Sequence, residues 1–256
     1  RIHSEINQLR SDQGGTVSGR LSYSNPNLQQ IPARNKEFGN KIRSLFLPEE
    51  GRQWGSFDYS QQEPRLVAHY AASVDNTFEG AAEFIEAYKN ESADFHQIVA
   101  DMAGITRTQA KTINLGLFYG MGKAKLAKEL GITKDKAENL LRQYGERVPF
   151  VKKLATDVSS SASKYGFIRT IRGRKCRFDM WEPSTFGMNK AMQYEEAKAI
   201  YGNNIRRAFT YKALNRLIQG SAADQTKQAM IDCYKAGFKP LLQIHDELCF
   251  SLNNEN

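Results

Sequence analysis

Two short apolar runs separated by only two residues constrain the fold of this chain more than any other feature. Segments 241–244 (Leu-Leu-Gln-Ile) and 247–250 (Glu-Leu-Cys-Phe) each have the length of a strand, and only His245-Asp246 lies between them. Two-residue loops commonly join antiparallel strands. The sequence therefore predicts a tight hairpin with a charged tip, although an ordinary solvated turn explains that tip equally well when it is taken alone.

A second acidic residue stands at the end of another predicted strand. Residues 54–60 alternate enough to form a strand, and Asp58 lies near its end. A carboxylate there is costly unless something charged meets it. The alternative for Asp58 alone is an N-cap of the helix that the pattern predicts over 62–72.

A helix predicted over 107–119 carries two cations in its first turns. Steps of four place Arg107, Lys111, Leu115 and Tyr119 on one gently drifting face. The helix dipole also favours anions near that N-terminus. The stripe suits a nucleoside triphosphate, with phosphates at the cationic end and the sugar and base further along. The alternative is an amphipathic helix with a solvated basic edge.

The remaining pattern is mostly helical. A hairpin is predicted over 167–178, no element is predicted over 182–200, and 205–235 is helical for most of its length. Together with the strands, this mixture predicts an α+β fold. Further helices are predicted over 81–89, over 95–102, over 124–130, after the cap Thr133, and over 151–164 up to Gly166.

Charge and cysteine content limit the class of protein. The net charge of +8 favours a polyanionic partner, of which nucleic acid is the commonest, although a merely basic globular protein is the alternative. Three cysteines without metal-ligand spacing argue against a disulfide framework. No apolar run approaches membrane-spanning length, and the first residues do not look like a signal peptide. A reducing cytosol fits these features.

Taken together, the acidic and basic segments resemble motifs A, B and C of the family A DNA polymerases. The resemblance implies a polymerase palm of antiparallel sheet and helices with mostly helical fingers, a right-hand architecture lacking the thumb. It implies palm over 1–75 and 207–256, and fingers over 76–206. The matching segments follow the family's order and span nearly the whole chain: 16–32, 56–65, 94–96, 107–120, 219–224 and 243–247.

The resemblance also implies the catalytic residues. Asp58 and Asp246 would bind two magnesium ions, with the backbone carbonyl of Tyr59 as a third ligand and Glu247 as an accessory acid. Lys111 would contribute to catalysis at the triphosphate. The chemistry agrees, because magnesium prefers carboxylate oxygens. Two such ions lower the pKa of the primer hydroxyl and stabilise the leaving pyrophosphate.

The implied nucleotide site lies along the cationic helix. Arg107, Lys111 and His96 would hold the triphosphate. Glu63, bonded to Tyr119, would be a steric gate against a ribose 2′-hydroxyl. Leu115 replaces the aromatic residue of the best-known members, which predicts altered handling of the sugar because an aliphatic side chain cannot stack as a ring does. Further nucleotide contacts would come from Tyr59, Gln61 and Arg43.

Six polar residues match positions that contact primer–template DNA in the family. The minor groove presents acceptors common to every correct base pair. Arginine and glutamine donors there would check pair geometry without reading sequence. The six are Arg20, Asn27, Gln29, Asn215, Gln219 and His245.

The sequence therefore predicts template-directed DNA synthesis from dNTPs on a primer 3′-hydroxyl, without proofreading, in the cytoplasm of a bacterial or phage-infected cell. Partners would be primer–template DNA, dNTPs and the remaining polymerase segments, namely the thumb and the C-terminal palm. The chain alone is expected to be weakly active or inactive. The alternatives are a single-subunit RNA polymerase-like enzyme and a catalytically weak or inactive DNA-binding fragment.

Overall fold

A computed structural model describes residues 2–9, 14–32, 37–73, 85–86, 94–118, 121–185, 187 and 190–253, without the side chains of Met102, Leu115, Leu117, Phe118 and Arg147. The strands are β1 (Glu5–Asn7), β2 (Ser22–Ser24), β3 (Gln53–Asp58), β4 (Phe167–Arg169), β5 (Lys175–Arg177), β6 (Trp181–Pro183), β7 (Ile205–Arg207), β8 (Pro240–Ile244) and β9 (Glu247–Leu252). The helices are α1 (Gly39–Arg43), α2 (Gln62–Ser73), α4 (Phe95–Ala103), α5 (Arg107–Phe118), α6 (Lys123–Leu130), α7 (Lys134–Arg147), α8 (Pro149–Tyr165), α9 (Tyr194–Tyr201) and α10 (Ala213–Lys235), with short 3₁₀ turns η1 (Leu28–Gln30) and η2 (Thr210–Lys212).

The chain divides into two compact units, which are described separately below. The first unit consists of Arg1–Gln62 and Gln219–Asn256, and the second of Glu63–Ile218. Helices mixed with small antiparallel sheets confirm the predicted α+β class. The assignment of palm and fingers to 1–75, 76–206 and 207–256 stays a prediction. Among the described residues, no helix has both the length and the apolar character needed to cross a bilayer.

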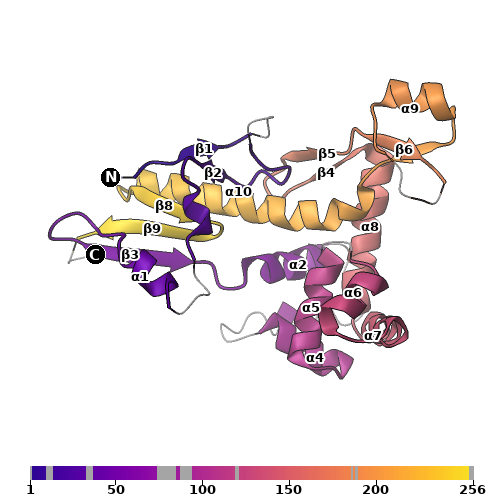
Figure 1. The fold of residues 1–256 in the computed structure, drawn as a ribbon, viewed down its shortest axis with the longest axis horizontal. Helices are drawn as coiled ribbons and strands as arrows, with labels where there is room; N and C mark the ends of the chain where they lie inside the picture. The colour runs from indigo at the N-terminus through magenta and orange to yellow at the C-terminus, as the bar shows by residue number, and fades with distance from the viewer. Residues whose placement is uncertain are drawn as a thin grey trace. The chain divides into compact units, whose positions relative to one another are not determined.

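A three-stranded antiparallel sheet in the order β3-β9-β8 forms the centre of the first unit (Figure 1). The predicted hairpin is confirmed, because β8 and β9 pair directly and Ile244 lies opposite Glu247 across the two-residue turn. His245 begins that turn with φ of 58°, a left-handed conformation that histidine adopts more often than most residues. The predicted strand over 54–60 is confirmed as β3, which pairs with β9 along its whole length.

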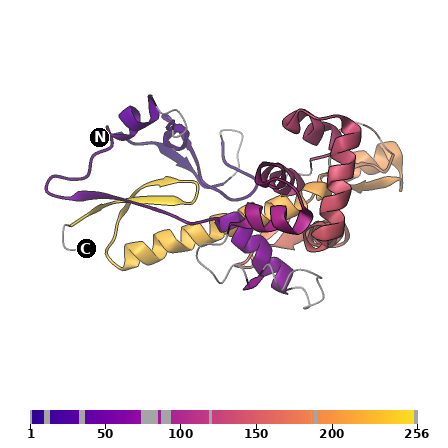
Figure 2. The ribbon, with the colours of Figure 1, turned by 90° about the horizontal axis from the view of Figure 1, so that it is seen from below.

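Helix α10 runs beside this sheet in two perpendicular views (Figures 1 and 2). Ala229 and Cys233 of α10 line an apolar cavity together with Phe57, Leu248 and Phe250 of the sheet. At the start of α2, the buried Gln62 amide lies 3.2 Å from Thr226 Oγ1 and 3.3 Å from the carbonyl oxygen of Ala222. These contacts anchor the chain that follows β3 onto α10.

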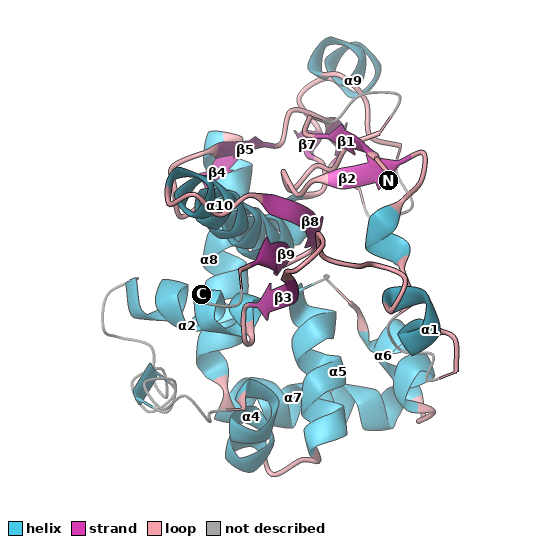
Figure 3. Ribbon diagram, turned by 90° about the vertical axis from the view of Figure 1, so that its left-hand side faces the viewer, coloured by secondary structure: helices cyan, strands magenta, loops and turns pink. Residues whose placement is uncertain are grey.

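Helices α4 to α8 form the body of the second unit, in which α4 packs against both α5 and α7 (Figure 3). The predicted start and stop signals hold. Thr133 caps α7 by accepting a hydrogen bond from the Lys136 amide. Gly131 and Gly166 end α6 and α8 in the left-handed conformation. The predicted helix over 81–89 lies almost wholly outside the described residues.

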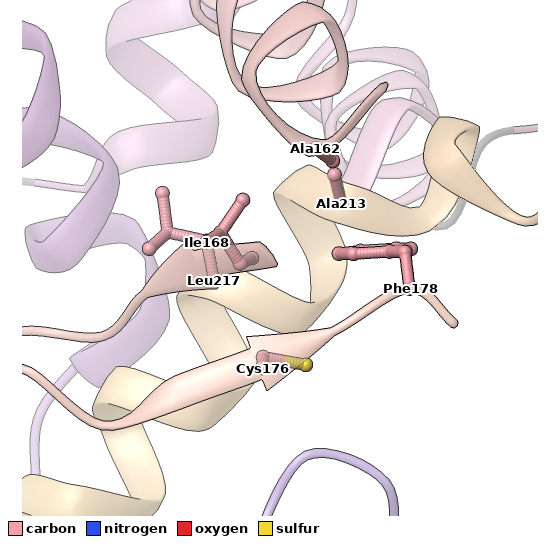
Figure 4. Packing of buried hydrophobic residues seen from close by; sticks show 6 residues of the cluster. All are labelled: Ala162, Ile168, Cys176, Phe178, Ala213 and Leu217. Atoms are coloured by element: carbon pink, nitrogen blue, oxygen red, sulfur yellow. The ribbon is translucent and has the colours of Figure 1, made fainter. Parts of the chain in front are cut away.

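A small apolar core joins the predicted hairpin β4–β5 to two helices of the same unit (Figure 4). Arg216 closes its edge, because its guanidinium lies 4.5 Å from the Phe178 ring centre and donates to the Arg177 carbonyl at 3.0 Å. The hydrophobic side chains in this core are Ala162, Ile168, Cys176, Phe178, Ala213 and Leu217.

The region from 181 to 212 differs from expectation. The prediction of helix from residue 205 is wrong at its start, because Ile205–Arg207 forms β7 and pairs with β6. Two contacts favour the strand. Arg206 forms an ion pair with Glu182 at 2.8 Å, and the Arg207 guanidinium lies 4.6 Å from the Trp181 ring centre. Such cross-strand pairs override a local helical pattern. Strands β1 and β2 were also not predicted from the sequence.

Candidate active site

Three carboxylates meet at one end of the central sheet in the first unit. Asp58 ends β3 directly opposite Glu247, the first residue of β9, and Asp246 precedes Glu247 in the hairpin turn. Burial raises the pKa of Asp58, and the negative charges of Asp246 and Glu247 raise it further against a lowering hydrogen bond from the Tyr59 amide. The topology therefore brings Asp58 and Asp246 together from opposite ends of the chain.

Glu247 differs from the other two acids because neighbouring side chains hold it in place. The Ser56 hydroxyl donates a hydrogen bond to its Oε1. The Arg43 guanidinium lies 3.9 Å from Oε2. Within the described part of the chain, neither Asp58 nor Asp246 forms an ion pair. Among the described residues, the two aspartates thus bring two negative charges together without a cation paired to either.

The donor set at this end of the sheet fits a hard divalent cation. Asp58 and Asp246 offer carboxylate oxygens, and the Tyr59 carbonyl follows Asp58 in the chain. The donor set therefore consists of oxygen atoms, which is what magnesium prefers. No group of three or more His, Cys, Asp or Glu side chains among the described residues is arranged to hold a metal. A set of two carboxylates and a backbone carbonyl does not require such a group.

The same hairpin gathers four of the six predicted DNA-contacting residues. Gln29 donates to Gln243 Oε1 at 3.0 Å, and Gln243 donates in turn to the His245 carbonyl. Asn27 caps η1 through the Gln29 amide at 3.1 Å. Arg20 and His245 line one small cavity beside α10. The other two, Asn215 and Gln219, lie one turn apart on α10.

The second unit places Arg107 against Asp94. The Arg107 guanidinium donates to Asp94 Oδ2 from Nε at 2.9 Å and from a terminal nitrogen at 2.7 Å. The other carboxylate oxygen caps α4 through the amides of His96 at 2.9 Å and Gln97 at 3.2 Å. Burial would raise the pKa of Asp94, but these hydrogen bonds and the charge of Arg107 outweigh burial and lower it.

Lys111 forms a cationic group with Arg107, and His96 lies beside these two cations. Burial lowers the pKa of the half-buried His96. The charge of Asp94 opposes that shift, and the nearby charges of Arg107 and Lys111 add to it. Lys111 is exposed one turn beyond Arg107 on α5. The three residues predicted to hold a triphosphate are therefore close enough to interact electrostatically.

Only some of the residues predicted to contact the sugar and base are among the described residues. Tyr119 and the side chain of Leu115 lie outside the described residues. Gln61 precedes α2 with φ of 53°, and Glu63 stands in the first turn of that helix. The pairing of Glu63 with Tyr119 stays a prediction.

Five residues that support these groups were not predicted from the sequence. Four of them stand inside the motif segments, so their positions could have suggested a supporting role: Ser56, Gln243, Asp94 and Asn114. Asn114 stands in the cationic helix, where its burial was the missing signal. Tyr144, whose hydroxyl donates a hydrogen bond to Asn114, lies on the helix predicted after Thr133, and nothing in the sequence marked that hydroxyl.

Comparison with known proteins decides the family. A family model described as DNA polymerase family A matches residues 1–256. The chain belongs to DNA polymerase family A. The predicted resemblance is therefore confirmed.

Relatives within family A include phage and bacterial enzymes. The chain is 38% identical over 301 residues to a DNA-directed DNA polymerase of Pseudomonas phage M6, covering 99% of this chain and 42% of that protein. It is 32% identical to DNA polymerase I of Pseudomonas aeruginosa, covering 100% of this chain and 26% of that protein. The chain thus spans well under half the length of these relatives.

A solved structure gives the fold likeness. The chain is similar to the POL domain of Pol1 from M. smegmatis in complex with DNA primer–template and dNTP, with a TM-score of 0.75 and 34% identity. The similarity covers 99% of this chain and 42% of that one. The α+β fold is therefore that of a family A POL domain.

Proposed function

We propose that this chain carries the nucleotidyl-transfer site of a template-directed DNA polymerase. The primer 3′-hydroxyl attacks the α-phosphorus of a dNTP, and pyrophosphate leaves. The observation that carries this proposal is the meeting of Asp58 and Asp246 at the end of the β3-β9-β8 sheet in a family A chain. The M. smegmatis POL domain, described with primer–template and dNTP, supports DNA and dNTPs as the substrates.

In this proposal Asp58 and Asp246, with the Tyr59 carbonyl, hold two magnesium ions. When bound, magnesium favours deprotonation of the primer hydroxyl and stabilises charge on the leaving pyrophosphate. Glu247 serves as an accessory acid whose orientation is fixed by Ser56 and Arg43. This support matters because an acid that swings freely would not keep a constant position beside the aspartates.

Arg107, Lys111 and His96 bind the triphosphate. The N-terminal end of α5 favours anions, and both cations lie in its first turns. Asp94 holds the Arg107 guanidinium in one orientation while leaving other donors for a phosphate. Lys111 offers a point charge to the triphosphate. The sugar and base would be surrounded by Gln61, Glu63, Leu115 and Tyr119. Of these, Glu63 would exclude a ribose 2′-hydroxyl.

The primer–template lies against the hairpin residues and α10. Donors from Arg20, Gln29 and Gln219 reach minor-groove acceptors that every correct pair shares, so binding does not depend on sequence. Asn27, Asn215 and His245 add further polar contacts. Further polymerase segments would strengthen the binding of DNA. No proofreading would take place at this site. DNA synthesis would take place in the cytoplasm of a bacterial or phage-infected cell.

A single-turnover primer-extension assay tests this proposal. Enzyme in excess over labelled primer–template keeps weak DNA binding from hiding the chemistry. The chain is assayed alone and as a chimaera in which it replaces the matching region of the phage M6 polymerase. We expect magnesium-dependent addition of the complementary deoxynucleotide, and little addition of the ribonucleotide.

Two results would argue for other functions. Equal use of ribonucleotides and deoxynucleotides would indicate an RNA polymerase-like enzyme. A folded chimaera that binds primer–template but adds no nucleotide would indicate a DNA-binding protein without catalysis.

A further inference from the structure

Three polar side chains of the second unit form a series of hydrogen bonds that ends beside Arg107 and Lys111. Tyr144 of α7 is 1% exposed and Asn114 of α5 is fully buried. The Tyr144 hydroxyl donates to Asn114 Oδ1 at 2.5 Å. The Asn114 amide nitrogen lies 3.2 Å from His96 Nδ1. The hydrogen bonds therefore run without a break from the helical interior to a half-buried imidazole.

Tyr144 fixes the direction of these hydrogen bonds, that is, which side chain donates and which accepts. Among the described residues, no other group accepts a hydrogen bond from the Tyr144 hydroxyl. If the Asn114 amide were flipped, a buried O–H would lose its acceptor, which is costly. Burial also raises the pKa of Tyr144 far above its ordinary value, so the hydroxyl keeps its proton. Asn114 therefore turns its oxygen to Tyr144 and its NH₂ group to His96.

The direction of these hydrogen bonds determines which nitrogen of the His96 ring carries the proton. An amide nitrogen only donates, so His96 Nδ1 must accept and carries no proton. The proton of the neutral ring then sits on Nε2. A protonated ring would set an Nδ1–H against the amide N–H. We propose that Tyr144 and Asn114 are positioning residues that hold His96 as the neutral Nε2–H tautomer.

The consequence for ligand binding rests on the proposed function. The described residues leave Nε2 without a partner, beside Arg107 and Lys111. A fixed Nε2–H donates to a phosphate oxygen of the dNTP and adds no third cation to a site that already has two. Protonation of His96 is opposed by its burial and by Arg107 and Lys111, and is favoured only by Asp94.

Nuclear magnetic resonance of the chain labelled with ¹⁵N-histidine tests this inference directly. The chain has four histidines, so His96→Gln assigns the signal. Two-bond ¹H–¹⁵N correlations distinguish the tautomers. We expect the Nε2–H form in the unaltered chain from about pH 6 to 8. In Asn114→Asp a carboxylate accepts from Nδ1, so the proton moves to Nδ1 and the pKa of His96 rises.

Tyr144→Phe provides a second variant in case Asn114→Asp does not fold. It keeps the buried ring but frees the amide, so His96 should show a mixture of tautomers. Tyr165→Phe, which removes an exposed hydroxyl from the same unit, is the matched control and should change nothing. An Nδ1–H form or a mixture in the unaltered chain would overturn the inference, as would an unchanged spectrum in Tyr144→Phe.

Nucleotide binding gives an independent readout. In single-turnover extension by the chimaera, Asn114→Asp should raise the dNTP concentration for half-maximal rate about tenfold, with a smaller change in the maximal rate. If the unaltered enzyme adds no nucleotide while His96 keeps its Nε2–H signature, the proposed function fails and the tautomer assignment stands. If extension is normal and the signature is absent, the reverse holds.

Discussion

At the scale of single residues, Asp94 performs two tasks with one carboxylate. One oxygen accepts from the first amides of α4 and the other holds Arg107. The first task stabilises a helix and the second orients a proposed ligand-binding cation. Because the tasks use different oxygens, substitutions can separate them.

Asp94→Ala removes both the cap and the ion pair, and should lower the free energy of unfolding by about 1–2 kcal/mol. Asp94→Asn keeps a capping oxygen and loses only a partly exposed ion pair, so the loss should stay below about 1 kcal/mol. Urea unfolding measures both. Equal losses in the two variants would show that the ion pair, rather than the cap, stabilises this region.

The lowered pKa of Asp94 also predicts a dependence on acid. Its stabilising contribution should be complete above the ordinary aspartate pKa of about 3.9. It should disappear as the pH falls through the lower pKa of the folded state. The difference in unfolding free energy between the unaltered chain and Asp94→Ala, measured from neutral to acid pH, checks this. A difference that does not change with pH would contradict it.

The charged residues of the candidate site stood out in the sequence, whereas the residues that orient them did not. Asp58, Asp246, Arg107 and Lys111 stood out because ionised groups at strand ends and helix starts need an explanation. Support from Asn114 depends on burial and on a partner from a distant helix, and neither is visible in local spacing.

At the scale of elements, glycines end two helices of the second unit in different surroundings. Gly131 has φ of 64° and open space where a Cβ would stand. Gly166 has φ of 75°, and a Cβ would come within 2.7 Å of the Arg207 guanidinium. That guanidinium is held by the Phe178 carbonyl at 3.0 Å and by the Trp181 ring.

Gly131→Ala should therefore cost about 1 kcal/mol in unfolding free energy, from left-handed backbone strain alone. Gly166→Ala should cost about 1 kcal/mol more, because Arg207 must leave its hydrogen bond and its ring contact. Thermal or urea unfolding of both variants provides the comparison. The extra cost should vanish in an Arg207→Ala background, and its persistence there would contradict the steric account.

Elements with strong local signals were predictable and those made by pairing were not. The hairpin β8–β9, the strand β3 and the capped helix α7 follow from alternation, a two-residue loop and a threonine cap. Strands β6 and β7 precede and follow α9 in the sequence, and their pairing depends on contacts such as that of Arg207 with Trp181. Strands β6 and β7 have only three residues each and are far apart in the chain, whereas the equally short β4 and β5 flank a turn that contains Gly173.

At the scale of the whole molecule, the net charge of +8 predicts how DNA binding depends on salt. Affinity for primer–template should fall steeply as salt rises. The reason is that lysine and arginine side chains bound to DNA phosphates release the counterions condensed on the DNA. Arg20→Ala should weaken binding by about tenfold on duplexes of any sequence, since the minor-groove acceptors are shared. Fluorescence anisotropy measures both effects.

Arg52→Ala is the matched control for this prediction, because Arg52 lies in the same unit and is already paired with Glu49 at 3.0 Å. It should bind almost as the unaltered chain does. A loss from Arg20→Ala that varied strongly between duplex sequences would indicate base-specific recognition instead.

The most direct test of the account is the rate of single-nucleotide addition by the chimaera after Asp58→Asn and after Asp246→Asn. Each change removes one carboxylate charge and keeps the side-chain size. Glu50→Gln removes a charge from an exposed residue of the same unit and is the control. We predict that each aspartate change lowers the rate at least about a thousandfold, or about 4 kcal/mol, while the control stays near normal. A rate within about tenfold of normal in either aspartate variant would contradict catalysis by this pair.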